Sequence, residues 1–166
     1  MVLSDSIPSH PQSEAVTALQ TVYGPPSQAG FGSAVFDEAV DPETDPESVA
    51  LQVYKHFIGD LWEKYGETAW MGTWKQVYRR PPETKPDIVA ELRAIADPAA
   101  VNHVPTLLLE ETEDQTGAQQ ALAAVFNDSQ VIDLRVYAIG DGAALSGLLV
   151  VGNRSNAITI LISLID

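Results

Sequence analysis

Apolar residues recur every three or four positions over much of the first two thirds of the chain, which is the spacing of amphipathic helices. The clearest such segment begins at Asp45-Pro46, where a capping carboxylate precedes a proline at the first helical position. We expect this helix to continue to Gly66, with an apolar stripe made of Leu51, Tyr54, Phe57, Ile58, Leu61 and Tyr65.

Shorter segments with helical spacing surround this helix. Residues 69–80 fit a strand and a helix equally well, because Trp70, Trp74 and Tyr78 share a face in either. A short strand is expected over 104–109. The remaining helices are expected after Ser13, from Ile88 to a stop at Pro98, and from Asp114 or Thr116 with Ala118, Leu122, Val125 and Phe126 facing inward.

The pattern changes to that of strands in the C-terminal part. Apolar residues alternate with polar ones from Ile132 to Ala138, which predicts a half-buried strand ending at the turn residues Gly140-Asp141-Gly142. Residues 148–151 are continuously apolar, as in a strand covered on both faces, and a last strand follows near 158–164. Three consecutive strands with short links predict an antiparallel meander. Helices followed by such a sheet, packed against them, indicate an α+β fold.

The length of 166 residues and the 45% apolar content indicate one soluble globular domain. We expect a flexible tail over residues 1–12 and a single domain over 13–166, with an acidic loop around 27–44. The chain has no cysteine, which excludes disulfides, thiolate metal sites and cysteine nucleophiles. No motif implies a cofactor.

The net charge is −14, from 9 Lys and Arg against 23 Asp and Glu. A chain this acidic is repelled by phosphate backbones and anionic membrane surfaces, which argues against nucleic-acid partners. No apolar run is long enough for a signal peptide or a membrane span, so we expect no membrane insertion and a cytoplasmic protein, at most peripheral to a membrane complex. Residues 1–50 contain no Lys or Arg, which indicates that different faces meet different partners or that acidic loops maintain solubility.

Two surfaces are candidates for binding another protein. The first, the aromatic–basic cluster, consists of Trp70, Trp74, Lys75, Tyr78, Arg79 and Arg80, residue types that dominate protein–protein hot spots. The alternative is that its tryptophans belong to the core, and we expect them to face inward while Arg79 and Arg80 face outward. The second surface is acidic and would suit a basic partner. It runs from Asp37 to Glu47, with Asp37, Glu38, Asp41 and Glu43 as its main docking residues, together with Glu110, Glu111, Glu113 and Asp114.

Patterns for catalysis or metal binding are weak. His56, Asp60 and Glu63 share a helical face and could hold a metal, but the same face is where any helix carries polar residues. Residues 139–142 resemble a phosphate loop, yet a strand follows instead of the helix that such a loop requires. No serine lies in a G-x-S-x-G elbow, and a hydrolase would have to use His56 or His103. We therefore expect no enzymatic activity and no metal.

The segment VYAIGDGAALSGLLVVGNRSNAITILISLID, from Val136 onward, resembles the end of the cyanobacterial nuclease A inhibitor family. The residues that fall on the family's Val-Tyr-x-Leu/Ile-Gly-Glu/Asp turn and its strand ending in Val-x-Gly are Val136, Tyr137, Ile139, Gly140, Asp141, Val150 and Gly152. The resemblance implies an α+β sandwich and an acidic inhibitor that meets a basic nuclease. The family's final Glu-Thr has no counterpart here.

Taken together, these patterns favour a non-enzymatic module that binds another protein or a multi-subunit complex. In size and charge the chain is similar to small acidic accessory subunits of cyanobacterial membrane complexes, such as the NADH-dehydrogenase-like complex. An acidic inhibitor of a basic nuclease is the alternative within the same class, and a small hydrolase is the alternative outside it.

Overall fold

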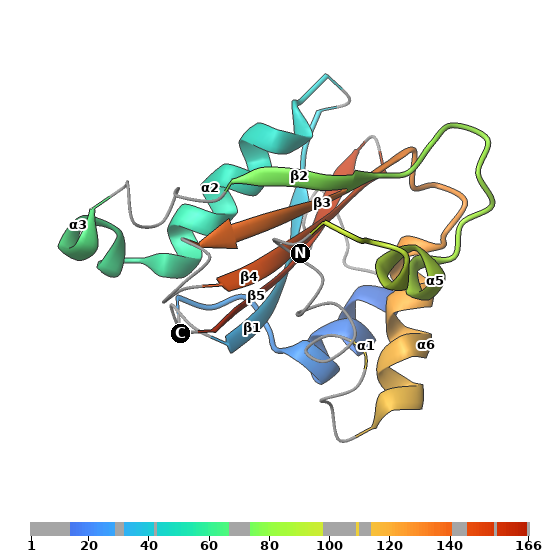
Figure 1. The fold of residues 1–166 in the computed structure, drawn as a ribbon, viewed down its shortest axis with the longest axis horizontal. Coiled ribbons are helices and arrows are strands. Elements are labelled where there is room, and N and C mark those ends of the chain that lie inside the picture. The colour runs from blue at the N-terminus through green and yellow to red at the C-terminus, as the bar shows by residue number, and fades with distance from the viewer. Residues whose placement is uncertain are drawn as a thin grey trace, which may run out of the picture.

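A computed structural model of the chain describes residues 14–28, 32–41, 43–66, 74–97, 109, 114–140, 146–154 and 156–165. Its described strands form one five-stranded antiparallel sheet in the order β1-β5-β4-β3-β2 (Figure 1). Helices cover both faces of this sheet, so the fold is α+β, as the sequence predicts. The expected tail over 1–12 lies outside the described residues.

The predicted meander is confirmed in the centre of the sheet. It consists of β3 (Asp133–Gly140), β4 (Ser146–Asn153) and β5 (Ala157–Ile165), paired antiparallel in chain order. The prediction that β3 is half-buried holds for its first part, where Leu134 and Val136 are buried while Asp133 and Arg135 are partly exposed, and it is wrong for Tyr137, which is 1% exposed. Helices on both sides of the sheet bury described side chains on both faces of these three strands.

Two earlier segments add the edge strands. β1 (Gly32–Ala39) pairs with β5, and β2 (Lys75–Arg79) pairs with β3. β1 lies inside the stretch expected to be an acidic loop around 27–44, so that prediction is wrong for these residues. The three residues Ala34, Val35 and Phe36 are buried, and their burial on the two faces of the sheet accounts for the strand. Residues 69–80 fit a strand and a helix equally well in the sequence, and the structure shows the strand over Lys75–Arg79.

One face of the sheet is covered by α1 (Glu14–Tyr23), α5 (Ile88–Arg93) and α6 (Gln115–Phe126) (Figure 1). Asp114 caps α6 by accepting a hydrogen bond from the backbone N–H of Gly117, as the pattern predicts for this start. The buried residues expected on α6 are confirmed. Of the strand expected over 104–109, only Leu109 is described, and it is buried in this core.

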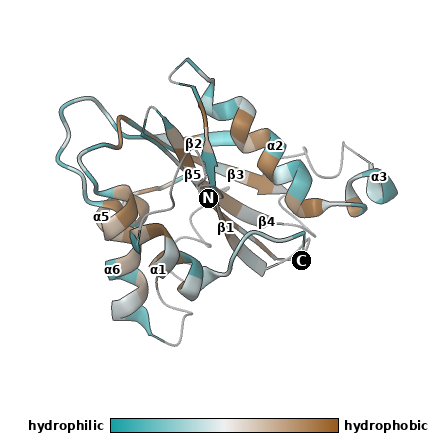
Figure 2. Ribbon diagram, turned by 180° about the vertical axis from the view of Figure 1, so that it is seen from behind, coloured by the Kyte–Doolittle hydropathy of each residue, from teal (hydrophilic) through white to brown (hydrophobic). Residues whose placement is uncertain are grey.

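The other face is covered by α2 (Pro46–Ile58), followed by the short helix α3 (Leu61–Tyr65) (Figure 2). The Asp45 side chain accepts a hydrogen bond from the N–H of Glu47, which confirms the predicted start. The single helix expected up to Gly66 is instead interrupted at Gly59, whose φ of 64° ends α2. In the described part of the chain, no helix is long and apolar enough to cross a membrane.

Candidate functional site

Trp74, from the aromatic–basic cluster, lies in a stack of three rings under α2. Its indole is 4.9 Å from the Tyr137 ring of β3 and 5.7 Å from the Tyr54 ring of α2, measured between centroids. The indole Nε1–H donates a 2.9 Å hydrogen bond to a Glu47 carboxylate oxygen. Trp74 therefore faces inward and joins β2 and β3 to α2, which is the core alternative for this residue. Trp70 lies outside the described residues.

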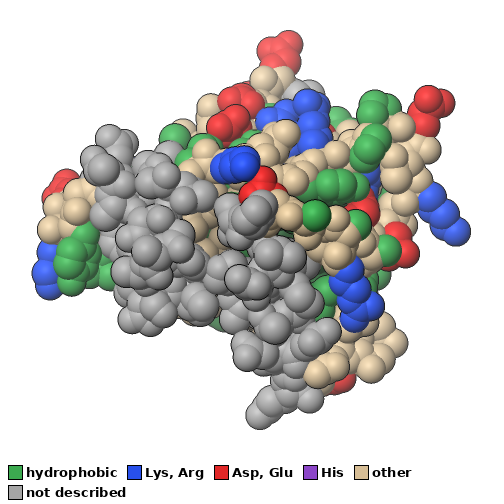
Figure 3. Space-filling view, in the orientation of Figure 1, with side chains coloured by type: hydrophobic (Ala, Val, Ile, Leu, Met, Phe, Trp, Pro, Cys, Tyr) green, Lys and Arg blue, Asp and Glu red, His purple; other side chains and the backbone are tan. Residues whose placement is uncertain are grey.

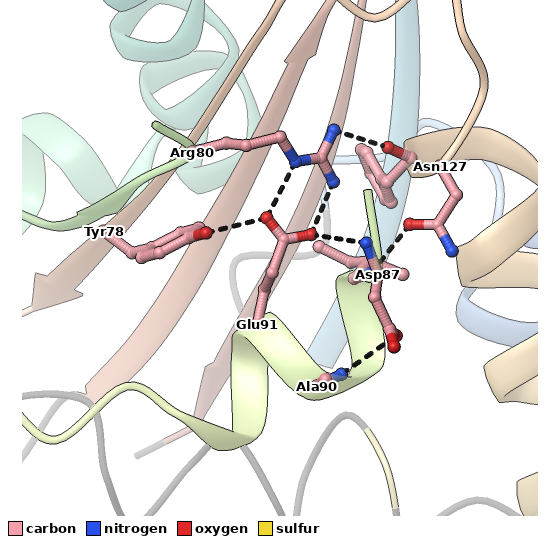
Figure 4. A network of polar contacts seen from close by, with 8 residues as sticks. Tyr78, Arg80, Asp87, Ala90, Glu91 and Asn127 are labelled. Carbon is pink, nitrogen blue, oxygen red and sulfur yellow. Dashed lines mark hydrogen bonds and ion pairs between the residues drawn. The ribbon is translucent and has the colours of Figure 1, made fainter. Parts of the chain in front are cut away.

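Arg80 and Tyr78 also have structural partners (Figure 4). The Arg80 guanidinium donates two hydrogen bonds of 2.7 Å to the Glu91 carboxylate and a third, of 3.0 Å, to the carbonyl of Phe126. The Tyr78 hydroxyl donates to the same carboxylate at 2.7 Å, and the N–H of Asp87 donates at 3.0 Å. Both side chains of the ion pair are only 8% exposed, so the prediction that Arg80 faces outward is wrong.

The network also sets the protonation of its members. Burial by itself raises the pKa of Glu91, but hydrogen bonds from Arg80, Tyr78 and the Asp87 backbone, with the positive charge of Arg80, outweigh it and lower the pKa. Burial, together with the Glu91 carboxylate, raises the pKa of Tyr78 to about 12. Glu91 is therefore held ionised and Tyr78 neutral, which suits a structural link rather than a proton-transfer site.

The two remaining cations of the cluster lie at the surface beside acids. Lys75 pairs with Asp97 at 2.6 Å, and Arg79 pairs with Asp133 at 3.1 Å. Asp133 also pairs with Arg135 on the same strand. Over this edge of the sheet, near β2, basic and acidic side chains are interspersed rather than gathered by sign (Figure 3). The cluster thus offers little unbalanced positive charge.

On the acidic surface, Asp37 turns out to be buried. Its carboxylate, 1% exposed, accepts a 2.6 Å hydrogen bond from Arg154 and another of 2.6 Å from the Thr159 hydroxyl. The prediction of Asp37 as a docking residue is therefore wrong, because this side chain joins β1 to β5 and its turn. Glu38, Asp41 and Glu43 are exposed as expected. Of the second acidic run, the structure describes Asp114, which caps α6.

Beside these exposed acids, three hollows follow one another along α2 on the side of β1. We call them together the α2 groove. The first, of about 630 Å³, lies at the start of α2; the second, of about 360 Å³, lies at its middle; the third, of about 430 Å³, lies at its end. Gln52 lines all three, and His56 lines the second and third. The shared lining residues make the hollows one continuous surface.

The α2 groove has an acidic rim and an apolar floor. Its described lining includes four carboxylates against one lysine, Lys55: these are Glu38, Asp41, Asp60 and Glu63. Phe36, Val49 and Val53 form the floor of the middle hollow. Sequence reasoning missed Gln52, Ser48 and Thr44 as site residues, although Gln52 and Ser48 belong to the polar face of the predicted helix and Thr44 directly precedes its cap. The groove could not be inferred without β1, because β1 forms the wall opposite α2 in the first two hollows.

The face proposed for a metal falls in the same groove. His56, Asp60 and Glu63 all line its third hollow. However, within the described ranges no three histidine or carboxylate side chains lie close enough together to hold a metal ion. His56 is instead placed by Gln28, whose amide is 3.4 Å from Nδ1, and by an edge-on contact with the Phe36 ring. His10 and His103 lie outside the described residues.

A separate hollow of about 450 Å³ lies between residues 79–86 and 131–134, on the edge of the sheet that carries β2. Three prolines line it, and Ile132 beside them is 67% exposed. Its wall includes the Arg79–Asp133 ion pair, so it has no strong charge of either sign.

No protein-family model, curated protein or solved structure matches this chain.

Proposed function

We propose that this protein is a non-enzymatic binding module, a small acidic accessory subunit that docks on a larger protein assembly through the α2 groove. The observation that carries the proposal is the continuity of the three hollows along α2, with carboxylates on their rim and an apolar floor. An interface needs this combination, because apolar burial supplies affinity while charge supplies specificity and speed of encounter.

The distribution of charge supports a basic partner. The chain has a net charge of −14, so its field attracts a positively charged surface from a distance. The groove keeps the same sign locally, since its rim has more carboxylates than cations. The aromatic–basic cluster is less suited to docking, because Trp74 and Arg80 are occupied by Glu47 and Glu91 within the fold.

A second function of the same class, inhibition of a basic nuclease, is favoured by the same acidic rim. An inhibitor would cover the nuclease's phosphate-binding surface with Glu38, Asp41 and their neighbours. The identity of the bound protein separates the two functions: a non-catalytic subunit of an assembly supports the first, and a nuclease whose activity falls on binding supports the second.

The proposal is tested by size-exclusion chromatography of a native extract from the cells that make this protein, at low and high salt, with detection by mass spectrometry. We expect elution with a larger assembly at low salt and release as salt screens the exposed charges. Elution as the isolated chain under both conditions would contradict the proposal.

A further inference from the structure

Resting on the proposed function, we infer that the α2 groove binds a short basic segment of the partner that has one aliphatic side chain at its centre and Lys or Arg on each side. The inference follows from the order of surfaces along the groove: acidic, apolar, then acidic again. A partner segment that occupies all three hollows at once must have side chains complementary to them in the same order.

The middle hollow selects the aliphatic side chain. Phe36, Val49 and Val53 at its floor are only 4%, 8% and 6% exposed, so they form a firm apolar surface below the opening. Pro26 adds an apolar wall from the segment that follows α1. A single leucine-sized side chain placed here is removed from contact with water. This burial of apolar surface supplies the favourable free energy of binding.

The two outer hollows select the cations. Glu38 and Asp41 line the hollow at the start of α2. Asp60 and Glu63 line the one at its end, where their two carboxylates outnumber the single lysine, Lys55. From Ser48 to Ile58 the helix rises about 15 Å, at 1.5 Å per residue. An extended segment of about five residues has that length. One or two cationic residues on each side of the aliphatic one therefore reach the carboxylates at both ends.

Gln52 is the residue through which the site can be blocked. It is exposed and lines every hollow of the groove, so a larger cationic side chain here obstructs the centre and repels the cations of the ligand. Gln76 on β2 is equally an exposed glutamine, and it lies on the opposite edge strand of the sheet from β1. Gln52→Arg and Gln76→Arg are thus a matched pair with the same change of charge.

The test uses the full ¹⁵N-labelled chain titrated with three capped pentapeptides, KKLKK, KKSKK and EELEE, and followed by amide chemical shifts. We expect KKLKK to shift the amides of Gln52, His56 and Glu38 in a saturable way. Replacing leucine by serine should weaken binding at least about tenfold, and EELEE should not bind. Gln52→Arg should abolish the shifts, while Gln76→Arg should leave them unchanged.

The inference is overturned if KKLKK produces no saturable shifts, if its shifts centre on β2, or if KKSKK binds as well as KKLKK. Such a result leaves the proposed function standing when the whole chain still elutes with a larger assembly. If the chain elutes alone while KKLKK still binds in the groove, the proposed function fails and the inferred ligand chemistry remains.

Discussion

The Arg80 guanidinium and the Glu91 carboxylate form a two-pronged ion pair that joins the end of β2 to α5, with both hydrogen bonds at 2.7 Å. Ten residues, three of them prolines, lie between the two along the chain. Because both side chains are buried, each depends on the other for its charge to be tolerated in the interior. The neighbouring Arg79 pairs with Asp133 at the surface, which provides a natural comparison.

Arg80→Ala should lower the free energy of unfolding by about 3–5 kcal/mol, because it leaves the Glu91 carboxylate buried without its cation. Arg79→Ala should cost less than about 1 kcal/mol, since its ion pair is exposed and Asp133 retains Arg135. Chemical denaturation of the two variants measures the difference. Equal costs would show that Arg80 is not buried against Glu91.

The contribution of Glu91 to the free energy of unfolding should decrease at acid pH. Its pKa in the folded protein is lowered from the ordinary value of about 4.3, so the contribution is complete above that value and is lost as pH falls through the folded pKa. Unfolding of the wild type and of Glu91→Gln should therefore differ most above the ordinary pKa of a glutamate, and the difference should shrink as pH falls below it. A difference that stays constant with pH would contradict this assignment.

Trp74→Ala should lower the free energy of unfolding by about 2–4 kcal/mol, less than for a fully buried tryptophan because the ring is half-buried. Trp74→Phe keeps the stack with Tyr54 and Tyr137 but loses the hydrogen bond to Glu47, and it should cost only about 1–2 kcal/mol. Thermal and chemical unfolding measure both values. If Trp74→Ala unfolds like the wild type but no longer binds the partner, the indole belongs to an interface.

The helices and the meander could be predicted because their signals are local. Asp45 and Asp114 cap helices whose apolar stripes follow within one turn, and β3, β4 and β5 are joined by short links. β1 was missed because its buried centre is only three residues long and ends in Asp37-Glu38. Nothing nearby shows that Asp37 is neutralised by Arg154, which lies 117 residues further along the chain.

The site was predicted only in part, for a related reason. The acidic residues Glu38 and Asp41 were singled out from the charge pattern and do lie at the α2 groove. Residue type favours the aromatic–basic cluster as a binding surface, yet type alone does not reveal that Arg80 faces Glu91. A groove has two walls, and the wall supplied by β1 depends on its pairing with β5, the last strand of the chain.

The central claim, docking through the α2 groove, is tested most directly by the matched pair Gln52→Arg and Gln76→Arg. Each variant is expressed in the native cells, and its elution with the larger assembly is compared at low salt after its folding has been verified by thermal unfolding. We predict that Gln52→Arg elutes as the isolated chain, because the added cation obstructs the acidic groove, while Gln76→Arg elutes with the assembly. Elution of both with the assembly, or release of Gln76→Arg alone, would contradict the claim, and release of Gln76→Arg alone would place the interface at β2.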